Sequence, residues 1–208
     1  MLDPGDYDGT YEADAGHLAL DFANTVSNRL DDRRHDWLDS YSNLLAWGEL
    51  VGTLSDDNSR ILLREAGRDP ELAAKALERA IQLREAVYRI FSAVAGGRAP
   101  ENDAVGVLNH FLTEALAHIR VVPEAGVFHW QWMGSEDALD RVCWPVARAA
   151  AELLTSDEIG RVGECLGDGC GWLFQDMSRN RSRRWCSMAE CGNRAKARRH
   201  YARRGKVT

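Results

Sequence analysis

The sequence predicts an α+β fold in two parts: a mainly helical N-terminal domain with a small antiparallel sheet, and a compact C-terminal module. Apolar residues recur with helical spacing over most of residues 37–154. Residues 119–132 alternate in the manner of a β-hairpin. From residue 159 onward the chain is rich in cysteine, glycine and arginine and has no broad apolar face. We therefore divide the chain into residues 1–158 and 159–208.

The elements of the N-terminal domain follow from this spacing. The clearest helix begins at Asp69, a capping residue, and Pro70, a first-turn residue, and it ends at Gly96 and Gly97. The hairpin is expected to turn around residues 123–126, with the sequence PEAG. An extended segment is expected over residues 17–25, and further helices over residues 37–52, 104–119 and 136–154.

The charge is divided unequally between the two parts. The whole chain carries 26 Lys and Arg against 32 Asp and Glu, a net charge of −6. Residues 161–208 hold 12 basic and 4 acidic residues, a net charge of +8, so residues 1–160 carry −14. The C-terminal module is therefore the part that can approach a polyanion.

The N-terminal residues show no targeting signal. They are acidic and lack the basic start and apolar stretch of a signal peptide, and the sequence has no run of 18 apolar residues. We expect a cytoplasmic protein without a membrane partner. Cytoplasmic thiols stay reduced, so the five cysteines are expected to be metal ligands or buried residues. Cys143, alone in an apolar segment, is expected to lie in the core.

The other four cysteines form two pairs with the same internal spacing, C-x4-C, separated by fifteen residues. Such pairs are typical of zinc sites. Four thiolates complete a tetrahedral Zn²⁺ site and leave no position for water, so we expect one structural zinc ion and no catalytic metal. The expected ligands are Cys165, Cys170, Cys186 and Cys191.

The residues of the C-terminal module predict the order of its secondary-structure elements. Glycines around the first pair permit a tight knuckle, which is followed by an expected strand over 171–178, a basic turn, and a returning strand over 184–186. Ser187 and Glu190 have the spacing of a capping box, so a helical turn is expected to carry Cys191. A helix follows over residues 194–204. This order of knuckle, hairpin and helix is that of a treble clef finger.

Two stretches within residues 161–204, CLGDGCGWLF and WCSMAECGNRAKARRH, closely resemble the CGNR zinc fingers of bacteria. That family is named for the run found here at residues 191–194. The resemblance implies that the four cysteines bind zinc and that Asn193 and Arg194 matter to the module. In the family the finger follows an ABATE-type domain, described as a stress-induced transcription regulator. Residues 16–29 and 38–54 resemble the start of that domain.

The basic C-terminal helix is the candidate contact with nucleic acid. Lysine and arginine gain affinity by releasing counterions from phosphates, arginine can read guanine, and asparagine can read adenine. For Asn193, a local hydrogen bond near the thiolates is the alternative. The candidate contacts are Asn193, Arg194, Lys196, Arg198, Arg199, Arg203 and Arg204.

These features predict a zinc-dependent, DNA-binding transcription regulator whose N-terminal domain senses a ligand or partner. One short finger offers a small interface, so we expect a homodimer that presents two fingers to two half-sites. A finger that binds RNA or an acidic protein surface is one alternative.

The N-terminal domain also contains polar residues in apolar surroundings, namely Asp21, Asn24, Arg29 and Arg84. Buried polar groups must be paired, so these residues either hold the fold together or line a ligand pocket. Arg84 is expected to pair with Asp21 or to meet an anionic ligand. The sequence carries no familiar catalytic motif, and we expect no enzyme activity. The alternative is an enzyme with its pocket around Asp21, Asn24 and Arg84 and a finger that serves for targeting.

Overall fold

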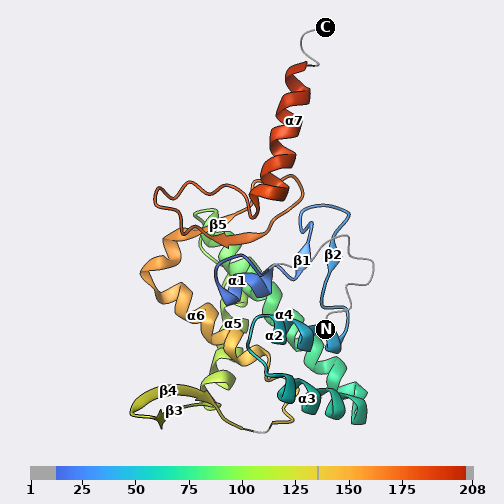
Figure 1. Ribbon diagram of the computed structural model, residues 1–208, viewed down its shortest axis with the longest axis vertical. Helices are drawn as coiled ribbons and strands as arrows, with labels where there is room; N and C mark the ends of the chain where they lie inside the picture. The colour runs from blue at the N-terminus through green and yellow to red at the C-terminus, as the bar shows by residue number, and fades with distance from the viewer. Residues whose placement is uncertain (1–12, 135, 205–208) are drawn as a thin grey trace.

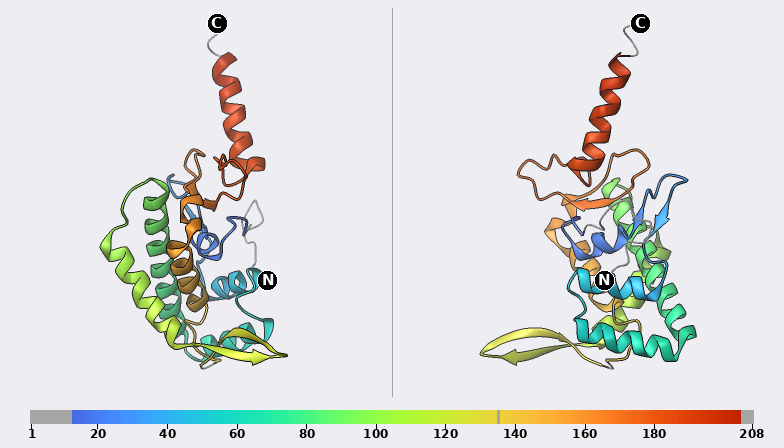
Figure 2. Two further views of the ribbon diagram at one scale, coloured as in Figure 1. Left: turned by 90° about the vertical axis from the view of Figure 1, so that its left-hand side faces the viewer. Right: turned by 45° about the vertical axis from the view of Figure 1, so that its right-hand side comes forward.

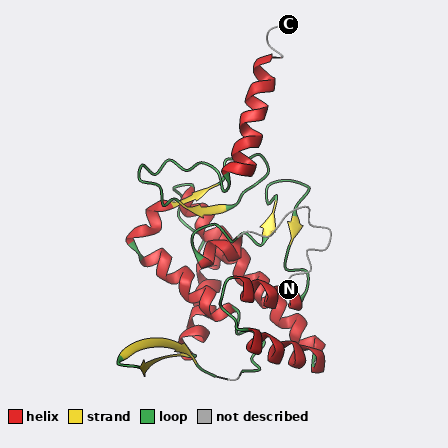
Figure 3. Cartoon of the chain, in the orientation of Figure 1, coloured by secondary structure: helices red, strands yellow, loops and turns green. Residues whose placement is uncertain are grey.

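The computed structural model describes residues 13–134 and 136–204, and of residues 203 and 204 it describes the backbone alone. Within this part of the chain the fold is mainly helical, with three separate two-stranded sheets (Figure 3). The long helix α4 (Pro70–Ala95) packs on α5 (Asn102–Ala117), which packs in turn on α6 (Cys143–Thr155). The short helix α1 (Leu18–Ala23) packs against both α4 and α6 (Figure 1). The predicted fold class is confirmed.

Helix α4 has the ends that the sequence predicts. The Asp69 side chain accepts a hydrogen bond from Leu72 N–H at 2.9 Å, Pro70 occupies the first turn, and Gly96 follows the last residue. Capping of the first free amides and the fixed φ of proline favour a helix start here. The buried side of the helix includes Leu83, Val87, Ile90 and Phe91, all in the main core.

Two helices connect α1 to α4. Helix α2 (Tyr41–Leu50) lies within the helix expected over residues 37–52 and is capped by Ser40. Helix α3 (Asp56–Arg68) is not among the expected elements, although Ser55 caps it and accepts a hydrogen bond from Asn58 N–H at 3.2 Å. Of the residues of α3 only Ser59 and Leu62 are fully buried, so the helix lies largely on the surface.

The extended segment expected over residues 17–25 is wrong, because most of it forms α1. The imidazole of His17 accepts the Ala19 amide at 3.3 Å and caps the helix. Residues 19–23 are all buried. A short apolar run that is buried on every side shows no helical periodicity, and tertiary packing decides its conformation.

The hairpin expected over residues 119–132 is confirmed. Strands β3 (Ile119–Glu124) and β4 (Val127–Trp132) pair antiparallel in one continuous register and turn at Ala125 and Gly126. The helix expected over residues 136–154 begins later than predicted, at Cys143, because residues 136–142 form turns. Pro145 then lies in the first turn of α6, where its missing N–H costs no hydrogen bond. Cys143 is buried in the core as predicted, and burial raises the pKa of its thiol.

The remaining strands lie where the finger meets the N-terminal domain. Strand β1 (Val26–Ser27) pairs with β2 (His35–Asp36), and β5 (Val162–Glu164) pairs with β6 (Leu173–Gln175). A short 3₁₀ helix (Asp157–Arg161) leads directly from α6 into β5. None of the helices in the described ranges is long and apolar enough to cross a membrane.

Asn24 joins the finger to the N-terminal domain. Its side-chain amide donates to the Leu173 carbonyl at 2.8 Å and accepts the Leu173 N–H at 2.9 Å. Trp172 donates its indole N–H to the carbonyl of Val26 at 2.8 Å. Asn24 is 2% exposed, so both of its bonds are made away from water. The end of α1 therefore holds strand β6 in place.

A candidate zinc site joined to the helical domain

The four cysteines predicted as ligands come together at the C-terminal end of the fold, at the base of helix α7 (Asn193–Arg204). Their sulfur atoms all lie within 4.8 Å of one another, and all four side chains are buried. Cys186 Sγ is 3.6 Å from Cys170 Sγ and 3.6 Å from Cys191 Sγ. None of the four cysteines forms a disulfide.

This cluster fits a zinc ion. Zn–S bonds of about 2.3 Å in a tetrahedral site place neighbouring sulfurs about 3.8 Å apart, close to the separations found here. A set of thiolates alone suits Zn²⁺, and four of them leave no coordination position for a substrate. Cys165, Cys170, Cys186 and Cys191 would therefore hold one ion whose contribution is to fold stability.

The first cysteine pair lies on a tight knuckle that follows β5. Cys170 N–H donates to the Gly167 carbonyl at 3.0 Å, and Gly167 N–H points at Cys165 Sγ at 3.3 Å. A Cβ on Gly167 would stand only 2.8 Å from Cys191 Sγ. The knuckle thus brings its backbone against the sulfurs, and glycine is required for this approach.

The returning strand expected over residues 184–186 is wrong. Strand β6 pairs with β5, which precedes the knuckle, and residues 182–184 have no regular structure. The reason lies in Asp176, whose carboxylate accepts the amides of Ser178 and Arg183, both at 2.8 Å. These bonds close residues 177–183 into a loop, so the chain that follows β6 turns back without forming a second strand. A backbone hydrogen bond from Leu166 N–H to the Arg184 carbonyl, at 3.1 Å, joins the knuckle to the segment that leads to Cys186.

The second cysteine pair lies on a helical turn, as the capping-box spacing predicts. Ser187 Oγ accepts the Glu190 amide at 3.4 Å at the start of a π-helical turn (Met188–Gly192) that runs into α7. A Cβ on Gly192 would lie 2.7 Å from the Met188 sulfur. Asn193 donates from its side-chain amide to the Ala189 carbonyl at 3.0 Å. Asn193 therefore holds the turn that carries Cys191, and Gly192 leaves room for the Met188 side chain.

Arg194 completes the run CGNR by contacting the metal site. Its guanidinium donates to Cys191 Sγ at 3.0 Å, and this hydrogen bond raises the pKa of Arg194. A donor beside a thiolate stabilises its charge and orients it toward the metal. Arg194 is thus in direct contact with a candidate zinc ligand.

Replacing Arg194 with alanine is expected to weaken zinc binding by about 10- to 100-fold, the usual cost of losing a hydrogen bond to a metal ligand. Competition with a chromophoric chelator measures this affinity. Arg198→Ala is the matched control, because Arg198 lies one turn further along α7 and pairs with Asp168, not with sulfur. Equal zinc affinities for the two variants would contradict the inference that Arg194 supports the zinc ligand Cys191.

The basic residues of α7 differ in their contacts. Arg194 and Arg198 point toward the knuckle, where they meet Cys191 and Asp168. Lys196 and Arg199 are exposed, and Lys196 has no side-chain partner among the described residues. Within the described part of the chain, Arg199 bonds the Ala195 carbonyl of its own helix, at 3.3 Å. The side chains of Arg203 and Arg204 lie outside the described residues.

Arg183 is a residue of the site that the sequence did not single out. Its guanidinium donates to the carbonyls of Trp185, Gln175 and Cys186 and lies over the Phe174 ring, 4.7 Å from the centroid. It therefore ties strand β6 to the second cysteine pair. Within the basic run RSRR no pattern distinguishes it from Arg184, which is exposed.

The polar residues predicted in the N-terminal domain do not share one set of contacts. Asp21 accepts the Ala15 amide at 2.9 Å, and burial raises its pKa to about 6. Arg84 pairs with Asp36, through bonds of 2.6 and 2.7 Å, and with Glu85 at 2.9 Å. The expected intrafold ion pair of Arg84 is present, but its partner is Asp36 instead of Asp21.

Arg29 and Arg84 belong to one buried network. Arg29 donates to Glu85 at 2.8 Å and to the Ala23 carbonyl at 2.7 Å. Burial alone would raise the pKa of the Asp36 and Glu85 carboxyls, but the hydrogen bonds and charges of the two arginines lower it. Arg84 is fully buried, so it depends on these carboxylates to balance its charge.

This network lies beside the loop between β1 and β2, which touches the zinc knuckle. The backbone amides of Arg29 and Leu30 donate to the carbonyls of Cys170 and Gly169, both at 3.0 Å. A change at Glu85 or Asp36 would therefore reach the metal site through one short loop.

Taken together, the fold and the cysteine cluster define a helical domain joined to a four-cysteine zinc finger. Comparison with protein-family models identifies both parts. Residues 16–157 match the ABATE family, described as "Putative stress-induced transcription regulator", and residues 161–204 match the CGNR zinc finger. The first match covers more than half of the chain, which belongs to the ABATE family. None of the curated proteins matches this chain.

Proposed function

We propose that this protein regulates transcription by binding DNA through helix α7 and the neighbouring basic loop of its zinc finger. The observation that carries the proposal is the position of α7, which projects from the body of the protein (Figure 2). Lys196 and Arg199 are exposed on this helix, and among the described residues neither forms an ion pair. A helix held at one end by a metal site and carrying exposed basic residues has the shape and charge to enter a DNA groove.

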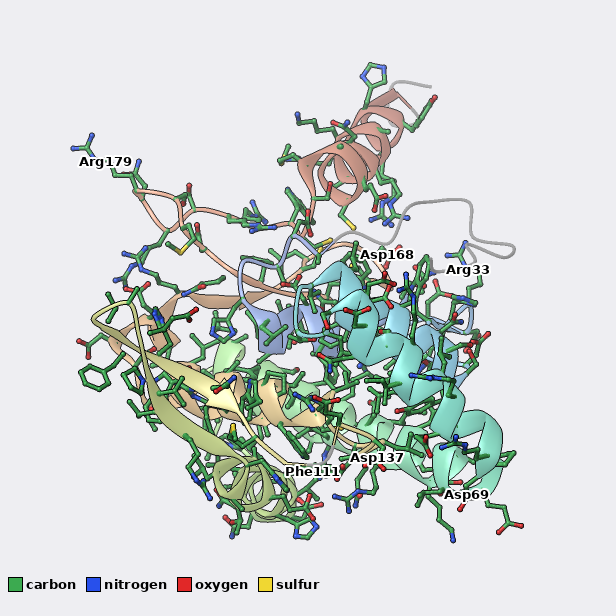
Figure 4. All side chains as sticks on the ribbon, turned by 60° about the horizontal axis from the view of Figure 1, so that its bottom comes forward. Arg33, Asp69, Phe111, Asp137, Asp168 and Arg179 are labelled. Carbon is green, nitrogen blue, oxygen red and sulfur yellow. The ribbon has the colours of Figure 1, made fainter. Side chains whose placement is uncertain are left out.

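The loop formed by residues 177–183 adds a second basic element beside α7. Arg179 and Arg181 are exposed, and Arg179 points away from the body at the end of the loop (Figure 4). A surface hollow of ≈ 600 Å³ lies between this loop and the second cysteine pair, lined in part by Ser178, Ser182 and Arg184. Hydroxyl and guanidinium groups are common phosphate contacts, so the loop can follow the DNA backbone next to the helix.

The proposal assigns phosphate contacts to residues that are free to make them. Arg194, Arg198 and Asn193 were candidates for reading bases, but each has a partner within the finger. Moving Arg194 onto a base would remove a donor from Cys191. Lys196 and Arg199 can contact phosphate without such a loss.

In this proposal the N-terminal domain responds to a ligand or partner. The support is the network of Arg29, Arg84, Glu85 and Asp36, which adjoins the loop that bonds the knuckle. A ligand or partner that drew the partly exposed carboxylate of Glu85 or Asp36 away from these arginines would loosen that loop. DNA binding by the finger would then depend on the occupancy of the helical domain.

The proposal is tested with Lys196→Ala combined with Arg199→Ala. Fluorescence anisotropy with duplex DNA over a salt series should show weaker binding to every sequence, with a log–log salt slope smaller by about 2, one for each lost phosphate contact. The matched control is Arg64→Ala combined with Lys75→Ala, an equal change in charge at exposed positions of α3 and α4.

Equal DNA affinity and salt slope for the two double variants would contradict the proposal. Competition at fixed salt separates the alternatives for the finger. If structured RNA or an acidic polypeptide displaces the labelled DNA more effectively than unlabelled duplex does, the finger binds that polymer in preference to DNA.

A further inference from the structure

The hairpin β3–β4 projects from the opposite end of the molecule from α7 and stands apart from the helices over most of its length (Figures 1 and 2). It is also unusually apolar for an exposed element. Phe128 is 72% exposed, Trp130 60% and Val121 54%. Large exposed apolar groups that gather on one element mark interaction surfaces more often than single ones do.

The register places these side chains on one face of the hairpin. Trp130 pairs with Val121, Phe128 with Pro123, and Trp132 with Ile119. Directly paired residues point to the same face of a sheet, and alternate residues along a strand share that face. This face, which we call the apolar face, therefore consists of Ile119, Val121, Pro123, Phe128, Trp130 and Trp132.

Among the described residues, other parts of the fold cover the apolar face only at the end of the hairpin nearest the helices. Ile119 is buried, and the Trp132 ring lies 6.2 Å from the ring of Trp144 in α6. Toward the tip, Phe128 and Val121 are more than half exposed. A two-stranded hairpin is at best marginally stable in water unless further strands or a helix cover its apolar face. The outer part of this hairpin lacks such cover among the described residues.

A groove opens beside the apolar face, between the hairpin and helices α5 and α6. It has a volume of ≈ 300 Å³ and is lined mainly by Leu112, Leu116, Ile119, Trp130, Arg148 and Ala151. Phe128 of the same chain is not part of this lining, because it lies two residues further toward the tip. A cavity of about 150 Å³ is enough to hold a benzene molecule, so this groove has room for a phenyl ring.

We propose that the hairpin is a dimerisation arm that packs against a second copy of this chain, with Phe128 of each copy in the groove of the other. One chain thus carries both the projecting ring and the groove that accepts it. A two-fold arrangement satisfies both at once and closes, so it yields a dimer and not a filament. No other partner is required to cover either surface.

The exposed area agrees with this occupant. Arg148 lies at the groove, where it pairs with Glu152 at 2.7 Å and its guanidinium is 4.6 Å from the centre of the Trp130 ring. Exposed aromatic surface on Phe128 and Trp130 amounts to about 200–300 Å² per copy. With Val121 and Leu116, which are about half exposed, the apolar surface of the two copies approaches the total of about 1,000 Å² that a specific interface needs.

The test is the oligomeric state in the absence of DNA, measured by sedimentation for wild-type protein and for Phe128→Glu. The wild type should show a reversible dimer at concentrations of about 1 to 100 µM. Phe128→Glu should raise the dimer dissociation constant by about 30-fold or more, as the loss of a central aromatic anchor does. Because Phe128 is exposed in the single chain, this variant should fold normally.

Val127→Glu is the matched control. Val127 is the neighbouring residue, is 57% exposed and lies on the opposite face of the same hairpin, so the variant adds the same charge without entering the groove. It should dimerise as the wild type does. A wild-type protein that stays monomeric throughout this range, or equal effects of the two variants, would overturn the proposal. The measurement contains no DNA, so it is independent of the function proposed for the finger.

Discussion

Removing zinc is expected to unfold the finger and to destabilise the helical domain with it. Metal binding contributes about 10–16 kcal/mol in small zinc fingers, more than the few interactions of this polar segment can replace. Strand β6 and the knuckle are bonded to Asn24 and to the β1–β2 loop, so their loss exposes the end of α1. Hydrogen exchange before and after chelation should show lost protection in residues 162–175 and weaker protection in α1.

Cysteine variants separate loss of the metal from loss of a thiol. Cys186→Ser should reproduce the effect of the chelator and should not be rescued by added zinc. Cys143→Ala is the matched control, because Cys143 is also buried but lies in the core of the helical domain, remote from the cluster. It should keep full protection in the finger. Intact protection of residues 162–175 in zinc-depleted wild type would contradict this account of the finger.

Replacing Arg84 with methionine is expected to lower the free energy of unfolding by about 1–3 kcal/mol, the usual cost of leaving a partly buried hydrogen-bonding group without its partner. Arg84 is fully buried and binds two carboxylates, Asp36 and Glu85. Methionine fills a similar volume but leaves Asp36 without its main partner. Urea denaturation followed by circular dichroism measures the change.

Arg89→Met on the same helix is the control for this effect. Arg89 pairs with Glu101 and Asp103, but its side chain is 43% exposed. Exposed ion pairs contribute about 0–1 kcal/mol, so this variant should be nearly as stable as the wild type. If both variants lose the same stability, the Arg84 network is not a principal support of the fold.

The sequence predicted best those features that depend on local chemistry. Helix α4 carries its signals at both ends, in Asp69, Pro70 and Gly96, and the structure follows them. The cysteine cluster was predictable because paired ligands at fixed spacing have few other uses. The hairpin was predictable because its alternation of side chains and its turn sequence agree.

Features that depend on distant partners were not predictable. Nothing near Arg84 in the sequence points to Asp36, which lies 48 positions earlier. The helical conformation of α1 follows from burial on every side. Asp176 ends the strand β6 by binding amides of its own loop, a choice that a strand-like pattern does not reveal. Arg194 looked like a DNA contact because its charge is visible in the sequence and its bond to Cys191 is not.

The most direct test of this account compares the duplex-DNA affinity of zinc-loaded and zinc-depleted protein over one salt series, with zinc content measured in each sample. The account predicts one zinc ion per chain, binding that weakens steeply with salt, and loss of binding on depletion that returned zinc restores. Unchanged DNA binding by the zinc-depleted protein, or no DNA binding by the zinc-loaded protein, would contradict the claim that the zinc finger presents α7 to DNA.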